Sequence, residues 1–337
     1  MKTLKFFSNK VICITGGAGF IGSHLVERLS AYNCKIIIID NLSSGRLSNI
    51  KKFINNKKNI FFYKKDLNSI KNLNIIVKEV DYFFHLAALA DIVPSIKNPG
   101  KYFRANVTAT LKILENLNTQ KIKKFIYLAS STCYGIPSSY PTNEKSKIDT
   151  KYPYALTKYM GEQLVMHWAK IYKLKAISLR LFNVFGTRSR TSGTYGAVFG
   201  VFLAQKISGK PLTVVGNGKQ KRDFTYVSDV VDAILQAAMS KYSNEIFNIA
   251  SGKPRSINEI VHLLKHKYVN IPKRPGEPNI TWADIKKAKN ILKWKPKTTF
   301  DDGVKELLSK INFWKKAIVW TPKKIEFATK EWFKYLK

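Results

Sequence analysis

The first half of the chain alternates short apolar runs with helical patterns, and this alternation constrains the fold more than any other feature. Strands are expected over residues 11–16, 35–40, 59–66, 80–88, 123–131 and 175–186, and helices over 21–32, 107–119 and 154–172. Strands that alternate with helices form a parallel sheet covered on both faces. The apolar runs are nearly continuous, as in strands buried on both sides. We therefore predict an α/β protein with a doubly wound parallel sheet.

The pattern changes after about residue 183. Loops become longer and carry more Gly and Pro, and helical patterns recur over residues 198–207, 227–239 and 256–268. The sequence predicts one domain over residues 1–183, to which some later segments return. Residues 184–337 are expected to form mainly a second, smaller α/β domain that binds the substrate.

Three glycines lie between the first predicted strand and the first predicted helix. Gly16, Gly19 and Gly22 occur at every third position of "CITGGAGFIGSHL". Glycine lets a backbone turn approach a pyrophosphate closely, and the helix that follows offers free N–H groups. Glycines also serve ordinary tight turns, so the triplet alone is a weak signal. Its position between a strand and a helix favours a Rossmann-type dinucleotide site.

A carboxylate at the end of the second predicted strand supports this interpretation. Asp40 lies close to the spacing at which an acidic residue meets the ribose hydroxyls of the adenosine. A carboxylate there would repel a 2′-phosphate, so the sequence predicts NAD as the cofactor. Arg46 lies nearby and leaves NADP as an alternative, because an arginine can accommodate that phosphate.

Tyr154 and Lys158 are four residues apart in the predicted helix 154–172 and so lie on one of its faces. An ammonium group beside a phenol favours the phenolate and lowers the pKa of the tyrosine. The pair could then remove a proton from a sugar hydroxyl. Ser130, Ser131 and Thr132 follow the strand 123–131, at the sheet edge where ligands bind in open α/β folds. A hydroxyl there could orient the reacting oxygen toward Tyr154.

An ordered series of motifs gives the chain a family resemblance over nearly its whole length. The motifs are "TGGAGFIG", "DNLSSG", "HLAA", "SSTCYG", the Tyr154/Lys158 pair, "RLFNVFG", "RDFTYVSDV" and "RPGEPNITWADIKKA". The series resembles the extended short-chain dehydrogenase/reductases, and within them the nucleotide-sugar epimerase/dehydratase branch. The chain is most similar to the 4-epimerases of UDP-hexoses and UDP-N-acetylhexosamines.

The resemblance implies roles for residues at the matching positions. The implied catalytic residues are Ser130, Tyr154 and Lys158. The implied cofactor-binding residues are Gly16, Gly19, Phe20, Ile21, Gly22, Asp40, Asn41, Asp66, Leu67, Ala87, Ala88, Tyr154 and Lys158. The implied substrate-binding residues are Ser95, Ser131, Thr132, Asn183, Tyr195, Val198, Arg222, Arg274, Glu277 and Thr281. Asn106 would lie near the cofactor, and His85 is expected to have a structural hydrogen-bonding role.

Reactions of this family begin with removal of the C4 hydroxyl proton and transfer of the C4 hydride to NAD⁺. A 4-epimerase then returns the hydride to the opposite face of the 4-keto sugar. The 4,6-dehydratases need an acid and a base near C6, but Ser131 and Thr132 occupy those positions here. Thr281 would border the C2 substituent, and its small side chain is expected to admit an N-acetyl group. The sequence thus favours a 4-epimerase of UDP-GlcNAc/UDP-GalNAc or UDP-Glc/UDP-Gal.

Other functions remain open at this point. One is a different NAD-dependent change to a nucleotide sugar, by a 4,6-dehydratase, decarboxylase, C4 oxidase or 3,5-epimerase. Another is a non-catalytic NAD-binding regulator, against which the intact Ser130, Tyr154 and Lys158 set argues. GDP, CDP and dTDP sugars also remain possible, because no residue dictates uracil.

Charge and composition limit the partners. The chain has 58 Lys and Arg against 22 Asp and Glu, but these lysines are scattered and accompany no nucleic-acid-binding motif. We therefore expect a solvated basic surface and no nucleic-acid partner. Cys13, Cys34 and Cys133 form no CxxC pair, so neither a metal site nor a disulfide is expected.

The apolar segments and the resemblance bear on location and assembly. No apolar run is long enough to span a membrane, and the first ten residues do not resemble a secretory signal. A cytoplasmic protein without membrane contact is expected. Helices around residues 101–118 and 152–171 match those of a four-helix dimer interface in the family, so a homodimer is predicted.

Overall fold

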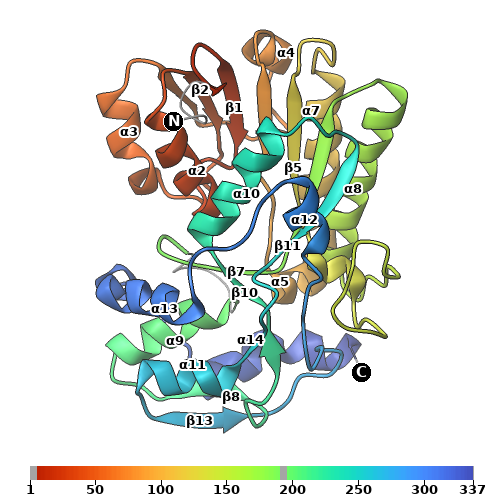
Figure 1. Ribbon diagram of the computed structural model, residues 1–337. Helices are drawn as coiled ribbons and strands as arrows, with labels where there is room; N and C mark the ends of the chain where they lie inside the picture. Colours follow the sequence, from red (N-terminus) through yellow and green to blue (C-terminus); the bar gives the residue numbers. More distant parts are fainter. Residues whose placement is uncertain (1–5, 190–195, 337) are drawn as a thin grey trace.

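The computed structural model describes residues 6–189 and 196–336. Its main element is a parallel sheet of seven strands in the order β11-β6-β5-β4-β1-β2-β3 (Figure 1). The strands are β1 (Val11–Thr15), β2 (Lys35–Ile39), β3 (Ile60–Tyr63), β4 (Tyr82–His85), β5 (Lys124–Ser130), β6 (Ala176–Leu181) and β11 (Glu245–Ile249). The predicted doubly wound α/β fold is confirmed. The strand order reverses at β1, which lies between β2 and β4, and ligands bind at such a switch point.

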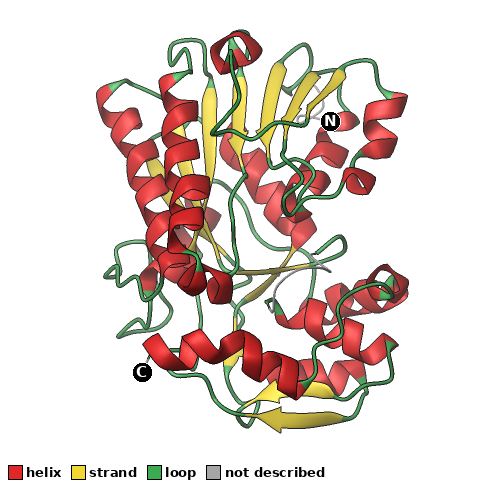
Figure 2. Cartoon of the chain, turned by 180° about the vertical axis from the view of Figure 1, so that it is seen from behind, coloured by secondary structure: helices red, strands yellow, loops and turns green. Residues whose placement is uncertain are grey.

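Helices bury the two faces of this sheet in separate apolar cores. One core holds residues of α2 (Phe20–Ser30) and α10 (Val227–Met239), while α3 (Lys51–Asn56) lies beside them. The other holds residues of α4 (Leu73–Val77), α7 (Ala109–Glu115) and α8 (Pro153–Ile171). Figure 2 shows this second layer from behind. Burial on both faces explains why the strands read as unbroken apolar runs.

Segments from beyond residue 183 pack on the sheet. β11 pairs in parallel with β6, and α10 packs against α2. The helix α12 (Lys286–Ile291) contributes Ala288 to the same core. The segment 175–186 is expected to be a strand with its exit loop, and β6 ends within it at Leu181. Part of the expected loop forms β7 (Asn183–Phe185), which pairs with β10 (Phe224–Tyr226).

The remaining elements pack around a third apolar core in the lower part of Figure 1. The strands are β8 (Leu212–Val215) with β13 (Tyr268–Ile271), and β9 (Lys221–Arg222) with β12 (Arg255–Ser256). The helices are α9 (Val198–Ile207), α11 (Ile257–Leu264), α13 (Phe300–Ser309) and α14 (Pro322–Tyr335). The chain also forms two 3-10 turns, η1 (Leu47–Asn49) and η4 (Ile311–Trp314). The helix predicted over 256–268 is too long. It ends at Leu264 because Lys265 adopts a left-handed conformation, and the chain then enters β13.

Helical structure runs almost without interruption from residue 99 to residue 115. The elements are α6 (Pro99–Phe103), a π-helical turn η2 (Arg104–Thr108) and α7, preceded by α5 (Ile92–Lys97). This helical run packs against α8 within one chain, while Phe103 on α6 and Leu156 on α8 remain exposed. Packing within the chain accounts for part of the apolar pattern, and the homodimer stays a prediction.

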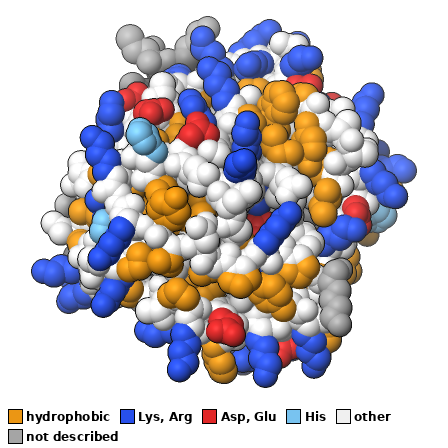
Figure 3. Space-filling view, turned by 90° about the horizontal axis from the view of Figure 1, so that it is seen from below, with side chains coloured by type: hydrophobic (Ala, Val, Ile, Leu, Met, Phe, Trp, Pro, Cys, Tyr) orange, Lys and Arg blue, Asp and Glu red, His pale blue; other side chains and the backbone are white. Residues whose placement is uncertain are grey.

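Figure 3 shows Lys and Arg side chains spread over the lower face, with apolar patches between them. The described part of the chain contains no helix with the length and apolar character needed to cross a bilayer.

Candidate active site

A cleft of about 640 Å³ crosses the carboxyl ends of the sheet strands and continues onto the lower elements. The glycine turn and Asp40 border one side of it, Ser130, Tyr154 and Lys158 lie along it, and Arg222 borders the other side. Most of the residues predicted for cofactor, catalysis and substrate thus line one cleft, although they are scattered over the sequence.

The glycine turn is packed too closely for side chains. Gly16 has a φ of +71°, and a Cβ there would lie 2.7 Å from the backbone nitrogen of Ala87. A Cβ on Gly22 would lie 2.1 Å from the carbonyl oxygen of Gly16. Gly19 is the N-cap residue of α2 and has no side chain with which to cap the helix. This turn has the form of a cradle in which backbone N–H groups can meet a pyrophosphate.

Asp40 is fixed by the backbone at the end of β2. Its carboxylate accepts hydrogen bonds from the N–H groups of Ala18, at 3.0 Å, and Leu42, at 2.8 Å. Burial raises the pKa of this carboxyl, and the two backbone hydrogen bonds oppose that effect. A carboxylate has further acceptor positions, so Asp40 can still receive two ribose hydroxyls. The side chain of Asn41 donates to Asp66 at 2.8 Å, which joins two more of the residues predicted to bind NAD. The residues present therefore fit NAD.

Tyr154 and Ser130 meet at the cleft. Tyr152 is the N-cap residue of α8 and Pro153 begins the helix, so Tyr154 lies in its first turn. Ser130 ends β5, and its hydroxyl lies 2.9 Å from the hydroxyl of Thr132. Burial raises the pKa of Tyr154 to about 12, and a side-chain hydrogen bond with Ser130 opposes this shift. Such a hydrogen bond places the two hydroxyl groups where both can reach one substrate oxygen.

Lys158 lies one turn further along α8 and is only 5% exposed. Its Nζ lies 4.3 Å from the centroid of the Tyr127 ring, a cation–π contact. Burial lowers its pKa to about 7, and the carboxylate of Glu162 opposes that shift. The expected lowering of the Tyr154 pKa by Lys158 is therefore wrong for this structure. Burial dominates both pKa values, and it leaves the lysine only partly charged at neutral pH.

The burial of Lys158 is expected to make the free energy of unfolding depend on pH. Because its pKa is lowered from 10.5 to about 7, the folded protein binds fewer protons than the unfolded chain between those pH values. The cost of the buried charge is complete below pH 7 and disappears as the pH rises to 10.5. We therefore expect Lys158→Met to raise the free energy of unfolding at pH 6.5 and to have little effect near pH 10.5. Urea unfolding of the nucleotide-free proteins at both pH values measures this difference, and a gain that is equal at both would contradict the buried-charge explanation.

Two buried polar residues form hydrogen bonds that connect the elements around the cleft. Asn106, in the π-helical turn η2, accepts the N–H of Leu89 at 2.8 Å and donates to the hydroxyl of Thr157 at 3.1 Å. It thereby ties the segment after β4 to α8, next to Lys158. The ring of His85 bonds to the hydroxyls of Thr15 and Thr110, and burial lowers its pKa to about 3. His85 is therefore neutral and has the structural role that was predicted.

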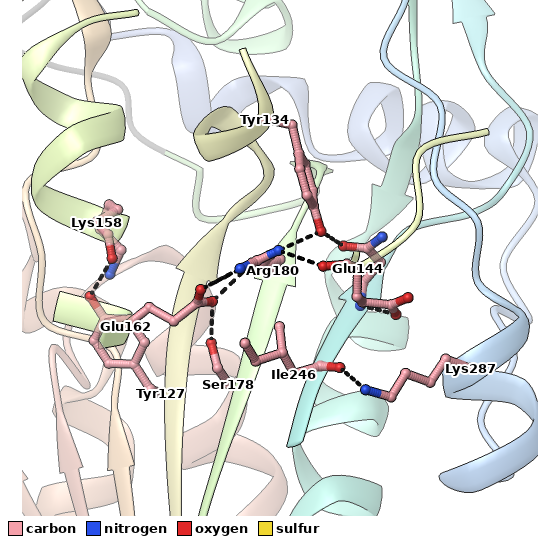
Figure 4. Close-up of polar contacts among 10 residues, drawn as sticks. Tyr127, Tyr134, Glu144, Lys158, Glu162, Ser178, Arg180, Ile246 and Lys287 are labelled. Atoms are coloured by element: carbon pink, nitrogen blue, oxygen red, sulfur yellow. Dashed lines mark hydrogen bonds and ion pairs between the residues drawn. The ribbon is translucent and has the colours of Figure 1, made fainter. Parts of the chain in front are cut away.

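An ion pair with almost no exposure lies beneath the catalytic helix (Figure 4). Glu162, on α8, lies 2.6 Å from Arg180 on β6, and their side chains are 1% and 4% exposed. Ser178 donates to the same carboxylate at 2.7 Å. Arg180 also donates at 2.8 Å to the hydroxyl of Tyr134, which ends the turn η3 (Ser131–Tyr134) directly after Ser130. That hydroxyl in turn donates to Asn248 on β11 at 2.8 Å, so the network links α8, β6, η3 and β11.

The opposite end of the cleft is rich in arginine. Glu277 lies between Arg222, at 2.8 Å, and Arg274, at 3.2 Å. The hydroxyl of Thr281 donates to the side chain of Asn183 at 3.1 Å. Guanidinium groups suit the oxygens of a diphosphate, which they can bind through two hydrogen bonds at once.

Most of the predicted substrate residues line this cleft, Ser95 does not, and Tyr195 is not tested. Lining residues include Ser131, Thr132, Asn183, Val198, Arg222, Arg274, Glu277 and Thr281. Ser95 is not among them. It is completely buried in α5, and its hydroxyl donates to the carbonyl of Ile92 at 2.6 Å, which satisfies it within its own helix. Tyr195 lies outside the described residues.

Several cleft residues were not foreseen. Tyr152, Arg188, Phe313 and Trp332 also line the cleft. Tyr152 lies two positions before Tyr154, and this closeness to a predicted catalytic residue was the signal in the sequence that could have identified it. Trp332 belongs to the amphipathic helix α14, whose apolar face the sequence shows without naming what it covers.

Known proteins are similar to this chain in fold and in sequence. The profile of the NAD dependent epimerase/dehydratase family matches residues 12–250. A putative UDP-glucose 4-epimerase of Methanocaldococcus jannaschii is 35% identical, over 89% of this chain and 97% of the relative. The solved UDP-N-acetylglucosamine 4-epimerase of Methanobrevibacter ruminantium, in complex with UDP-N-acetylmuramic acid, is 34% identical with a TM-score of 0.84, covering 90% of this chain and 99% of that one. A UDP-glucuronic acid 4-epimerase of Bacillus cereus, solved with UDP-glucuronic acid and NAD, is 31% identical with a TM-score of 0.82 and the same coverage.

Proposed function

This chain belongs to the NAD dependent epimerase/dehydratase family, and from that premise we propose that it is a nucleotide-sugar 4-epimerase. The observation that carries the proposal is that Tyr154 and Ser130 line the same cleft as the predicted cofactor and diphosphate residues. The glycine turn and Asp40 border that cleft on one side, and Arg222 and Arg274 border it on the other. A dinucleotide and a nucleotide sugar can therefore meet at Tyr154.

The proposed reaction uses these residues in defined roles. Tyr154 accepts the proton of the C4 hydroxyl as the C4–H bond breaks, and Ser130 hydrogen-bonds to the same oxygen. NAD held by the glycine turn and Asp40 would supply the acceptor and donor of the C4 hydride, together with a positive charge in the cleft. That charge favours the phenolate of Tyr154, whose pKa burial otherwise raises. Tyr154 gives its proton back to the C4 oxygen once C4 has been reduced from the opposite face. Lys158 holds the C4 end of the site electropositive.

Inversion at C4 requires the sugar to turn while the rest of the substrate stays bound. Arg222 and Arg274 are assigned to the diphosphate, which keeps the nucleotide in place as the sugar ring rotates. Ser131 and Thr132 offer hydroxyls where the dehydratases carry an acidic pair, and this supports epimerisation over 4,6-dehydration. The three relatives described above are all named for UDP-sugars, which supports uridine as the base.

The proposed substrates are UDP-GlcNAc/UDP-GalNAc and UDP-Glc/UDP-Gal. Thr281 supports the N-acetylated pair, because its short side chain is engaged with Asn183 and leaves room in the cleft. The 34% identity to a UDP-N-acetylglucosamine 4-epimerase supports the same choice.

We expect the purified protein to convert UDP-GlcNAc into UDP-GalNAc and to retain its NAD over many turnovers. Incubation with UDP-GlcNAc, UDP-Glc and UDP-glucuronic acid, followed by NMR of the products, measures this directly. A product other than the C4 epimer, such as a keto sugar or a pentose, would refute the proposed reaction.

A matched variant tests the role of Thr281. Thr281→Tyr adds a bulky ring at the position assigned to the C2 substituent, so kcat/KM for UDP-GlcNAc should fall at least about tenfold more than that for UDP-Glc. Equal losses for the two substrates would remove the argument from Thr281.

A further inference from the structure

The last helix of the chain, α14, borders the arginine-rich end of the cleft. Its buried face carries Ile325, Thr329 and Trp332 at helical spacing, and α14 packs against α5 (Figure 1). The hydroxyl of Thr321 caps the helix by accepting the N–H of Lys324. Of these buried residues, Trp332 is the one that lines the cleft.

Trp332 contacts two separate parts of the candidate active site. Its indole N–H donates to the carbonyl of Pro275 at 2.7 Å, and the guanidinium of Arg274 lies 5.5 Å from the ring centroid. The ring of Tyr152 also packs beside the indole, with the two ring centroids 6.0 Å apart. The indole is only 3% exposed, so neighbouring residues fix its position.

Each of these neighbours is connected to residues with a proposed role in binding or catalysis. Arg274 is ion-paired with Glu277, which also pairs with Arg222, so the segment after Pro272 is part of the anion-binding end. Tyr152 is the N-cap residue of α8, the helix that carries Tyr154. The indole therefore lies between the arginine assigned to the diphosphate and the start of the catalytic helix.

We propose that Trp332 is a positioning residue that holds Arg274 against the start of α8, and so keeps its guanidinium in place to bind the diphosphate. The proposal rests on the proposed function, because that function assigns the diphosphate to Arg274. A guanidinium over an aromatic face keeps its in-plane N–H groups for anionic oxygens, so the contact orients Arg274 without blocking it. The hydrogen bond to Pro275 fixes the backbone beside the same arginine.

Two substitutions separate the contributions of Trp332. Trp332→Phe keeps an aromatic face and loses the N–H donor, whereas Trp332→Leu keeps apolar volume and loses both. Phe327→Leu is the control, because Phe327 lies on the same helix and is 80% exposed. The measurements are the Kd of UDP by calorimetry, kcat and KM for UDP-GlcNAc, and the NAD content of each purified protein.

We expect Trp332→Leu to raise the Kd of UDP and the KM at least about tenfold. The kcat and the NAD content should change less than about twofold, well below the loss expected when a group in the chemical step is removed. Trp332→Phe should show a smaller rise in both constants, and Phe327→Leu should match the wild type. The split between KM and kcat distinguishes positioning from general destabilisation, which would also lower the NAD content.

Other outcomes decide against the inference. Unchanged UDP binding in both Trp332 variants overturns it, and so does a loss of NAD that parallels the loss of UDP affinity. A wild-type protein that binds none of UDP, dTDP, GDP and CDP overturns it as well. A wild-type protein that binds UDP but inverts no UDP-sugar refutes the proposed function alone, because the UDP affinities of the variants still test Trp332.

Discussion

Replacing Tyr154 by phenylalanine is expected to reduce kcat by at least about 1,000-fold, because the phenol is the group proposed to carry the C4 hydroxyl proton in both directions. Phenylalanine retains the ring, which packs edge-to-face against Tyr102 with centroids 6.5 Å apart. NAD content and thermal stability should therefore remain close to those of the wild type. The measurement is the initial rate of epimerisation at saturating UDP-GlcNAc.

Ser130→Ala is the graded companion to this variant. It removes the hydroxyl that hydrogen-bonds to Tyr154 but leaves the base in place, so its loss in kcat should be smaller. A Tyr154→Phe protein that turns over substrate at the wild-type rate would show that another group carries the proton.

The second large effect concerns stability. Arg180→Met is expected to lower the free energy of unfolding by about 3–5 kcal/mol, because it leaves the buried carboxylate of Glu162 without its cationic partner. The same change removes the donor to Tyr134 and so releases η3 behind Ser130. Urea unfolding at neutral pH measures this loss.

A control and a double variant give the comparison its meaning. Lys121→Met breaks an ion pair with Glu79 in which both side chains are largely exposed, and its effect should stay within about 1 kcal/mol. Replacing Glu162 by leucine in the Arg180→Met protein removes both buried charges and should recover part of the loss. If Arg180→Met and Lys121→Met were equally mild, the buried pair would have no special structural role.

The sheet was largely predictable because its strands are buried on both faces. Runs such as the isoleucines of β2 and the aromatic residues of β4 are apolar without interruption, and that pattern needs no knowledge of the partner strands. β11 was not predicted as a strand. It begins with Glu245 and joins the sheet only through β6, which lies far earlier in the chain. Pairing over such a separation is not visible in a local pattern.

The candidate site divides in a similar way. Spacing along the chain was enough to predict roles for Gly16, Asp40, Tyr154 and Lys158. Ser95 was misplaced, because a motif position does not reveal the direction in which a buried hydroxyl points. The pKa direction of Tyr154 was wrong because spacing along a helix says nothing of burial, which outweighs the nearby ammonium here. The Glu162–Arg180 pair was missed because it joins one residue of a helix to one of a strand.

The return of β11, α10 and α12 to the sheet has a mechanical consequence. The backbone passes between the upper and lower halves of the molecule several times, at Phe182, after Tyr226, after Ala250 and again on either side of α12. A rotation of one half against the other would have to bend all of these connecting segments, or tethers, together. Asn183, Arg222 and Thr281 lie on or beside these tethers, so any relative rotation of the halves would also shift the grip on a ligand held between them.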